Sequence, residues 1–252
     1  MDTPFEIIPI DENNVDKNGF FCYMSKRKEP GWKLKRDWLS QRFREGLKIL
    51  MVNEVGRRIT AFIEYIPGEY AWRVVNAPGY LVIHCLWVVG QGRGKGFGAR
   101  LIEACVADAR AQDKLGVVMV SSDKPWLADK KAFLRNGFEE VDQAPPSFQL
   151  LVHKLKPGPL PSFPTNWEER RARFGSGLSV IRTDQCPYME NATHQVEQIG
   201  EKYHIPVKVV EYKTSQELQQ NSPTPYGTFS TILDGKLLSY YYMTEADFKK
   251  LQ

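Results

Sequence analysis

The segment that decides the fold covers residues 80–98 and reads YLVIHCLWVVGQGRGKGFG. Its first ten residues are almost all apolar, β-branched or aromatic, which predicts a buried strand over Tyr80–Val89. After the glycines, apolar residues recur at helical spacing and predict an amphipathic helix: Phe97, Leu101, Ile102, Cys105, Val106 and Ala109. A glycine-rich turn therefore joins a buried strand to a helix.

The turn at residues 90–98 has the chemistry of an anion-binding loop. Glycines allow successive backbone N–H groups to point at one place, because no Cβ interferes. The start of a helix adds unpaired donors and a partial positive charge. Arg93 and Lys95 add two full positive charges. We expect the loop to bind a phosphate-bearing ligand, and a pyrophosphate suits these donors best.

Two common nucleotide motifs do not fit this loop. A Walker loop requires Ser or Thr after its lysine, whereas Lys95 is followed by a glycine. A dinucleotide fingerprint starting at Gly94 lies too late in the turn, and no ribose-binding acid follows it cleanly. The pattern R-x-x-G-x-G is met by Arg93, Gly96 and Gly98.

That third pattern resembles the acyl-CoA loop of the GNAT acetyltransferase superfamily. Residues 86–88 stand where the superfamily has an L-x-V strand, whose backbone pairs with pantetheine amides as an added strand would. Residues 132–138 (AFLRNGF) look like its closing helix-to-strand signature. The resemblance covers most of residues 5–155 and implies acetyl-CoA as co-substrate. It places the cofactor on Leu86, Trp87, Val88, Arg93, Gly94, Lys95, Gly96, Phe97, Gly98 and Phe133.

Acetyl transfer to an amine requires a group that removes a proton from the amine. His84 lies four residues before Val88 on the same strand, and imidazole titrates near neutrality. The resemblance makes His84 the first candidate base and Glu64 the second. A buried histidine with a purely structural role is the alternative. Strict alternation along the strand would put His84 and Leu86 on one face and Cys85 on the other.

The sequence departs from the superfamily where a proton donor is expected. Many members have a tyrosine at the position of Phe133, and an asparagine common seven residues earlier is replaced by Trp126. Water or a nearby group such as Tyr65 then serves as the acid, or the thiolate leaves unprotonated. A site that binds acyl-CoA without turnover is a further alternative.

A proline-rich segment at residues 156–164, KPGPLPSFP, predicts a linker. We expect a GNAT domain over 1–155, a linker with a short helix over 156–175, and a smaller domain over 176–252. The first domain is expected to be a mixed α/β sheet with flanking helices. Besides the strand over 80–89, its strands are expected at 5–10, 48–53, 59–66, 116–121 and 148–154. Gly56 is expected in the turn between the strands at 48–53 and 59–66. The other helices of this domain are expected at 11–26, 34–47 and 127–136.

The expected order of the second domain is β-α-β-α-β-β-α, which looks like a thioredoxin fold. The two domains together resemble the YoaP-like acetyltransferases. Cys186 stands near the start of the first helix, where a helix N-terminus would lower a thiol pKa. No second cysteine stands nearby, and Gly227 occupies the place of the thioredoxin-type cis-proline. We expect this domain to gate the substrate or to form a homodimer.

The amino-acid composition limits which partners and locations are expected for the protein. The chain has 252 residues, 42% apolar and 25% charged, with a net charge of +4. This mild surplus does not favour nucleic acid as a partner. No apolar stretch approaches a membrane span, and the N-terminus does not resemble a signal peptide. Four scattered cysteines without a C-x-x-C pair favour a cytoplasmic location, and no metal is expected.

The best interpretation is an acetyl-CoA-dependent N-acetyltransferase, in which a primary amine attacks the thioester directly. A non-catalytic acyl-CoA sensor and a thiol-dependent redox protein acting through Cys186 are the alternatives. The elements on the acceptor side, residues 11–47 and 67–78, carry charges of both signs. They therefore select no charge class for the acceptor, which is a small-molecule or peptide amine.

Overall fold

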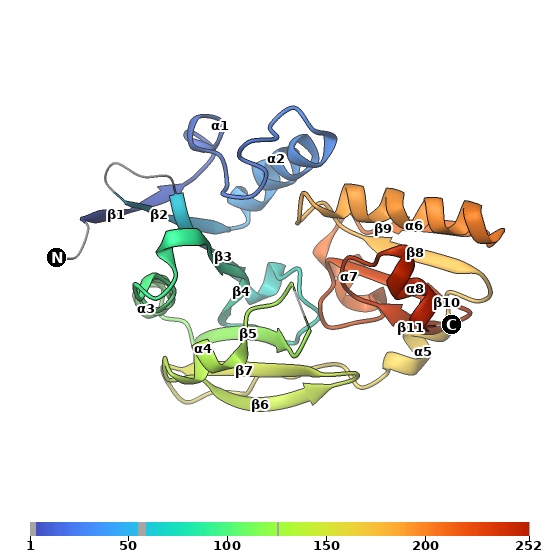
Figure 1. The fold of residues 1–252 in the computed structure, drawn as a ribbon. Helices are drawn as coiled ribbons and strands as arrows, with labels where there is room; N and C mark the ends of the chain where they lie inside the picture. Colours follow the sequence, from blue (N-terminus) through green and yellow to red (C-terminus); the bar gives the residue numbers. More distant parts are fainter. Residues whose placement is uncertain (1–3, 55–58, 125, 252) are drawn as a thin grey trace. The chain divides into compact units, whose positions relative to one another are not determined.

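The computed structural model describes residues 4–54, 59–124 and 126–251 (Figure 1). Its chain divides into two compact units. The first unit contains Met1–Ser25, Leu39–Ala71 and Val75–Phe163. The second contains Lys26–Trp38, Trp72–Val74 and Pro164–Gln252. Two short segments from the first 155 residues therefore belong to the same compact unit as the C-terminal residues.

The first unit is built on a mixed sheet with the strand order β1-β2-β3-β4-β5-β7-β6. Among the described strands of this sheet, β4 and β5 form a parallel pair, and all other neighbouring strands are antiparallel. Its strands are β1 (Phe5–Ile10), β2 (Lys48–Glu54), β3 (Ile59–Pro67), β4 (Tyr80–Val88), β5 (Gly116–Ser122), β6 (Glu139–Ala144) and β7 (Phe148–Lys154). The six predicted strands are confirmed to within a few residues. The predicted turn at Gly56 lies outside the described residues.

The helices of this half of the chain are α1 (Val15–Asn18), α2 (Pro30–Arg44), α3 (Phe97–Ala111) and α4 (Lys130–Leu134), with short 3-10 turns η1 (Gly68–Tyr70) and η2 (Gly90–Gly92). Helix α3 is confirmed. The helix predicted over 11–26 is wrong apart from α1. Its second half leaves the right-handed region, because Gly19, Phe21 and Tyr23 all have positive φ angles.

Three further elements differ from the sequence-based expectation. Helix α2 begins at Pro30, four residues before the predicted start, since proline fits the first turn of a helix. Strand β6 was not predicted because its sequence, EEVDQA, is largely polar, and Ala144 is its one buried residue. Helix α4 is shorter than predicted and starts after Asp129, whose side chain accepts from the Lys131 amide.

A β-bulge in β4 changes which face each side chain occupies. Glu64 pairs with Cys85 and Tyr65 pairs with Ile83, so His84 is the extra residue of the bulge. Ile63 and Tyr65 lie in the core that packs against α3, so Glu64 between them points to the opposite face. His84 contacts Glu64 and therefore shares that face. The prediction that His84 faces the same side as Leu86 is wrong, because the bulge shifts the alternation.

The second unit contains a separate sheet with the strand order β11-β10-β8-β9. Strands β8 and β9 are parallel, whereas β10 is antiparallel to both β8 and β11. Its elements are α5 (Trp167–Ala172), β8 (Leu178–Arg182), α6 (Met189–Tyr203), β9 (Val207–Glu211), α7 (Ser215–Asn221), β10 (Phe229–Leu233), β11 (Lys236–Ser239) and α8 (Glu245–Leu251). The predicted element order of this part is confirmed.

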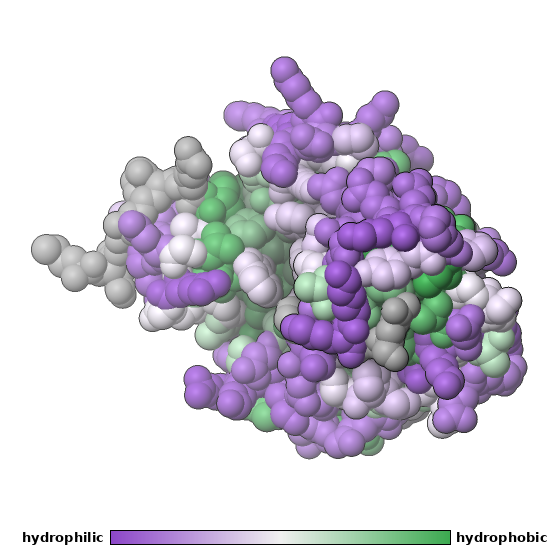
Figure 2. All heavy atoms as spheres, turned by 45° about the vertical axis from the view of Figure 1, so that its right-hand side comes forward, coloured by the Kyte–Doolittle hydropathy of each residue, from purple (hydrophilic) through white to green (hydrophobic). Residues whose placement is uncertain are grey.

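The surface is mainly hydrophilic on the face drawn in Figure 2, with apolar residues in smaller areas. The large apolar side chains that are exposed come from scattered positions: Tyr70, Trp87, Leu134, Leu160, Tyr188 and Val209. Among the described helices, none has the length and apolar content needed to cross a bilayer. Within residues 4–54, 59–124 and 126–251, no cluster of His, Cys, Asp and Glu could hold a metal ion.

Gly200 lets helix α6 pack closely on strand β9. A Cβ atom at Gly200 would lie 2.1 Å from Val207 Cγ2 and 2.9 Å from the Ile205 carbonyl oxygen. Gly98 in α3 is different, since the nearest atom to a Cβ there would be Val88 Cγ2 at 3.6 Å, an ordinary contact.

We therefore predict that replacing glycine with alanine changes the stability of the protein differently in α6 and in α3. Gly200→Ala should destabilise the protein by about 1–3 kcal/mol through overpacking. Gly98→Ala should leave stability unchanged or raise it by up to about 1 kcal/mol, because alanine favours helix. Urea unfolding followed by circular dichroism measures both. Equal midpoints for the two variants would contradict the packing described for Gly200.

Candidate functional site

Strands β4 and β5 separate in the middle of the sheet. They pair from Tyr80–Gly116 to Ile83–Met119, the last described pair between them. Beyond it β5 continues to Ser122 beside β7, and β4 continues to Val88 beside β3. The edge of β4 at residues 86–88 is therefore not paired with β5. Such an edge can bind an extended ligand that has amide groups, as it would bind an additional strand.

The glycine loop follows directly after this edge. Gly94 and Gly96 have φ angles of +79° and +76°, and a Cβ atom at either would have no atom within 4 Å. The first amide bonded inside α3 is that of Arg100, which donates to the Gly96 carbonyl oxygen at 3.1 Å. The amides of the first helical turn before Arg100 therefore have no intrahelical acceptor. Gly94 and Gly96 therefore border open space directly before a helix start that has amides without intrahelical acceptors, a combination suited to an anion.

The loop is held to the hairpin of β2 and β3 by Thr60 and Glu54. The Val89 amide donates to the Thr60 carbonyl oxygen at 2.8 Å. The Thr60 hydroxyl donates to Glu54 at 3.2 Å, and Lys95 forms an ion pair with the same buried carboxylate. Lys95 thus tethers the loop to the hairpin. Arg93 is exposed, and its guanidinium Nε donates to the Val88 carbonyl oxygen at 3.4 Å.

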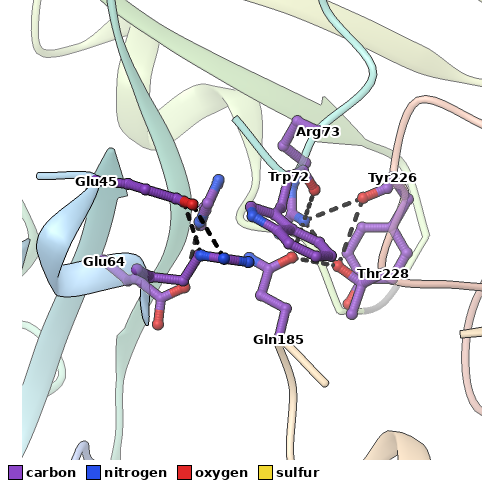
Figure 3. Close-up of polar contacts among 9 residues, drawn as sticks. Glu45, Glu64, Trp72, Arg73, Gln185, Tyr226 and Thr228 are labelled. Carbon is purple, nitrogen blue, oxygen red and sulfur yellow. Dashed lines mark hydrogen bonds and ion pairs between the residues drawn. The ribbon is translucent and has the colours of Figure 1, made fainter. Parts of the chain in front are cut away.

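Glu64 and His84 form a buried pair on adjacent strands. His84 Nδ1 lies 3.3 Å from Glu64 Oε1, and the two side chains are 0% and 4% exposed. Glu64 is labelled in Figure 3. A carboxylate that accepts from Nδ1–H fixes the imidazole tautomer in which Nε2 can take a proton. The pair faces the side of the sheet opposite α3, where Phe21 stacks on Phe62 at 4.4 Å.

Comparison with known proteins shows the family of this chain. The model of the acetyltransferase (GNAT) family matches residues 18–138. The chain is 32% identical over 248 residues to a Bacillus subtilis (strain 168) protein described as the uncharacterized N-acetyltransferase YoaP, with 97% of each chain covered. The chain belongs to the GNAT family of acetyltransferases.

Two further similarities are more limited. An L-methionine sulfoximine/L-methionine sulfone acetyltransferase of Pseudomonas paraeruginosa is 31% identical over 108 residues, which cover 43% of this chain and 60% of that protein. The crystal structure of a GNAT-family acetyltransferase from Staphylococcus aureus Mu50 aligns with a TM-score of 0.46 and 15% identity, over 61% of this chain and all of that one.

Three other residues expected to bind the cofactor, Trp87, Leu86 and Phe133, differ from one another in burial and in the face of the sheet that they occupy. Trp87 is 41% exposed and pairs across the strands with Phe62, so it lies on the same face as Glu64. Leu86 is buried on the opposite face, in the core against α3. Phe133 has no exposed surface and packs edge-on against Phe138 at 5.2 Å. Phe133 thus holds α4 to the core.

Tyr65 is the alternative acid and Cys186 the alternative thiol expected from the sequence. The Tyr65 hydroxyl donates to Asp108 of α3 at 3.0 Å, and burial raises the pKa of Tyr65 far above the usual value. Cys186 is partly buried and precedes the first residue of α6 by three positions. The sequence did not single out Glu54 or Thr60, because their link to the loop joins strands that are distant in sequence.

We predict that Gly96→Asp strongly weakens CoA binding. The new side chain would fill the open space inside the loop and repel the pyrophosphate, raising Kd by about tenfold or more. Isothermal titration calorimetry with CoA measures the effect, and Gly96→Asn separates the steric part from the charge.

The matched control is Gly175→Asp. Gly175 also has a positive φ angle, +65°, with no atom within 4 Å of a Cβ, but it lies in the second unit. It reproduces the backbone strain without touching the loop. Unchanged CoA affinity in a folded Gly96→Asp protein would refute the assignment of the loop.

Proposed function

We propose that this acetyltransferase transfers the acetyl group of acetyl-CoA to a primary amine by direct attack on the thioester. The observation that carries the proposal is the separation of β4 from β5 directly before a glycine loop at a helix start. The loop offers N–H groups for the pyrophosphate, and the β4 edge offers backbone groups for pantetheine. A ligand bound to both reaches along β4 toward its middle.

The Glu64–His84 pair supplies the base in this proposal. The amine binds protonated, and His84 Nε2 removes a proton so that the nitrogen lone pair can attack the thioester carbon. Glu64 stabilises the imidazolium that forms. The tetrahedral intermediate then collapses with loss of the CoA thiolate. An alkyl thiol has a pKa near 8.5, so the thiolate can leave without the tyrosine that Phe133 replaces.

The acceptor we favour is an amino acid derivative. The support is the partial similarity to an enzyme named for L-methionine sulfoximine and L-methionine sulfone. The direct test is release of CoA thiol from acetyl-CoA, followed with DTNB, across a panel of these two compounds, other amino acids, polyamines and peptides. Tight CoA binding without acetylation of any amine would favour the alternative, a non-catalytic acyl-CoA sensor.

Substitution of His84 tests the base. His84→Gln should lower kcat by about 10²–10⁴, the usual loss for a general base, with CoA affinity preserved. In the native enzyme activity should fall as the pH is lowered, because the protonated imidazole cannot accept the amine proton. A loss of less than about threefold with an intact pH profile would assign the base to Glu64 or to water.

A thioredoxin-like second domain is the other part of the proposal. In its support, the parallel pair β8–β9 and the antiparallel strands β10 and β11 follow the β-α-β-α-β-β-α order that the resemblance implies. A redox function would need Cys186 as its thiol. One cysteine cannot complete an intramolecular dithiol cycle, so we give acetyl transfer precedence.

Cys186 should accordingly be dispensable for acetyl transfer. Direct attack by an amine needs no acyl-enzyme, so Cys186→Ser should keep most of the turnover measured by CoA release. The variant should lose any alkylation by iodoacetamide that the native protein shows at that residue. Loss of turnover in a folded Cys186→Ser protein that still binds CoA would support the thiol-dependent alternative.

A further inference from the structure

The connection between β3 and β4, residues 68–79, is fixed at its base by the first unit. A Cβ atom on Gly68 would lie 1.9 Å from the Ala77 carbonyl oxygen, so the two ends of the connection touch. Glu69 accepts from the Gly79 amide at 2.8 Å. Asn76 exchanges two backbone hydrogen bonds with Ser162, at 2.8 and 3.1 Å. The base is therefore closed by short contacts.

The middle of the connection belongs to the second unit. Trp72, Arg73 and Val74 are 0%, 3% and 0% exposed. The Val74 amide donates to the Pro225 carbonyl oxygen at 3.1 Å, in the segment that leads into β10. The ring of Trp72 meets that of Trp38, which comes from the other short segment of the second unit, at a centroid distance of 5.3 Å.

Arg73 makes the densest set of these contacts (Figure 3). Its Nη1 donates to Gln185 Oε1 and to Thr228 Oγ1, each at 2.7 Å, and to the Tyr226 carbonyl oxygen at 3.0 Å. The guanidinium carbon lies 4.8 Å from the centroid of the Tyr226 ring. Thr228 in turn donates to Gln185 at 2.8 Å, so the acceptors are themselves connected. Hydrogen bonds from a buried guanidinium are among the stronger ones in proteins.

The connection lies at the end of β3 and β4 that is opposite to the glycine loop. The loop follows the last residue of β4, whereas residues 68–79 precede its first. Glu64 is three residues from the end of β3, roughly 10 Å along the strand. If acetyl-CoA enters from the loop, the amine can approach Glu64 and His84 from the end that the connection borders.

We propose that Arg73 holds the β3–β4 connection in place and that this connection borders the entry for the acceptor amine. Arg73 is thus a positioning residue. This inference rests on the proposed acetyl transfer, because it assigns the amine to the end of the strands that the connection borders.

The test uses the full chain, acetyl-CoA and the amine of the panel that gives the fastest CoA release. Arg73→Gln should raise KM for the amine by about tenfold, equivalent to the loss of one strong hydrogen bond, with KM for acetyl-CoA and kcat unchanged. Arg73→Lys, which keeps the charge, should fall between native and Arg73→Gln. Thr228→Val is a milder variant that removes one acceptor of Arg73.

Arg170→Gln is the matched control. Arg170 is also a buried arginine of the second unit, 6% exposed, with its Nη1 donating to the Gln219 carbonyl oxygen at 2.7 Å and its Cζ 5.3 Å from the Trp167 ring. It has no part in the contacts of residues 68–79 described above. An equal rise of the amine KM in Arg170→Gln would mean general destabilisation and would overturn the proposal.

Amide hydrogen exchange of the same proteins tests whether Arg73 anchors the β3–β4 connection. This measurement needs no amine substrate. Amides of residues 70–76 should exchange about tenfold faster in Arg73→Gln and Thr228→Val than in the native chain and Arg170→Gln. Unchanged exchange in that segment would overturn the proposal. If no amine is acetylated, the proposed function fails, and the positioning role in acceptor binding fails with it. The hydrogen-exchange result still decides whether Arg73 holds the connection.

Discussion

Parallel pairing between β4 and β5 ends at Ile83 and Met119, in the middle of the sheet. Each strand then continues beside its other neighbour, so the backbone of β4 beyond the bulge can pair with a ligand instead of a strand. The bulge at His84 lies directly after this point and turns His84 toward Glu64. One local irregularity therefore places the candidate base beside the edge that we assign to acetyl-CoA.

The loop after β4 depends on contacts with the β2–β3 hairpin. Gly92 packs against Thr60, where a Cβ atom would be 2.8 Å from the threonine Cβ, and Lys95 pairs with buried Glu54. These contacts fix the loop to the hairpin, and a fixed loop loses little conformational entropy on binding a ligand. The loop amides and exposed Arg93 are then the groups best placed to meet the phosphates.

The strands and the loop could be predicted because their signals are local: a long apolar run, glycines and helical spacing. Strand β6 was missed because its residues are mostly polar. The bulge at His84 was missed because alternation alone assumes an unbroken register. The Lys95–Glu54 pair and the Arg73 contacts join residues that are 41 and more than 100 positions apart, and no spacing rule brings such residues together. The fold was thus more accessible from the sequence than the contacts that hold the site.

The most direct test of this account is a crystal structure of the full chain with acetyl-CoA. We expect the pyrophosphate to accept from amides of residues 94–99, and the pantetheine to pair with the backbone of β4 at residues 86–88. The thioester carbon should lie within reach of an amine that contacts His84. A pyrophosphate bound away from the glycine loop, or a pantetheine that does not follow β4, would contradict the central claim.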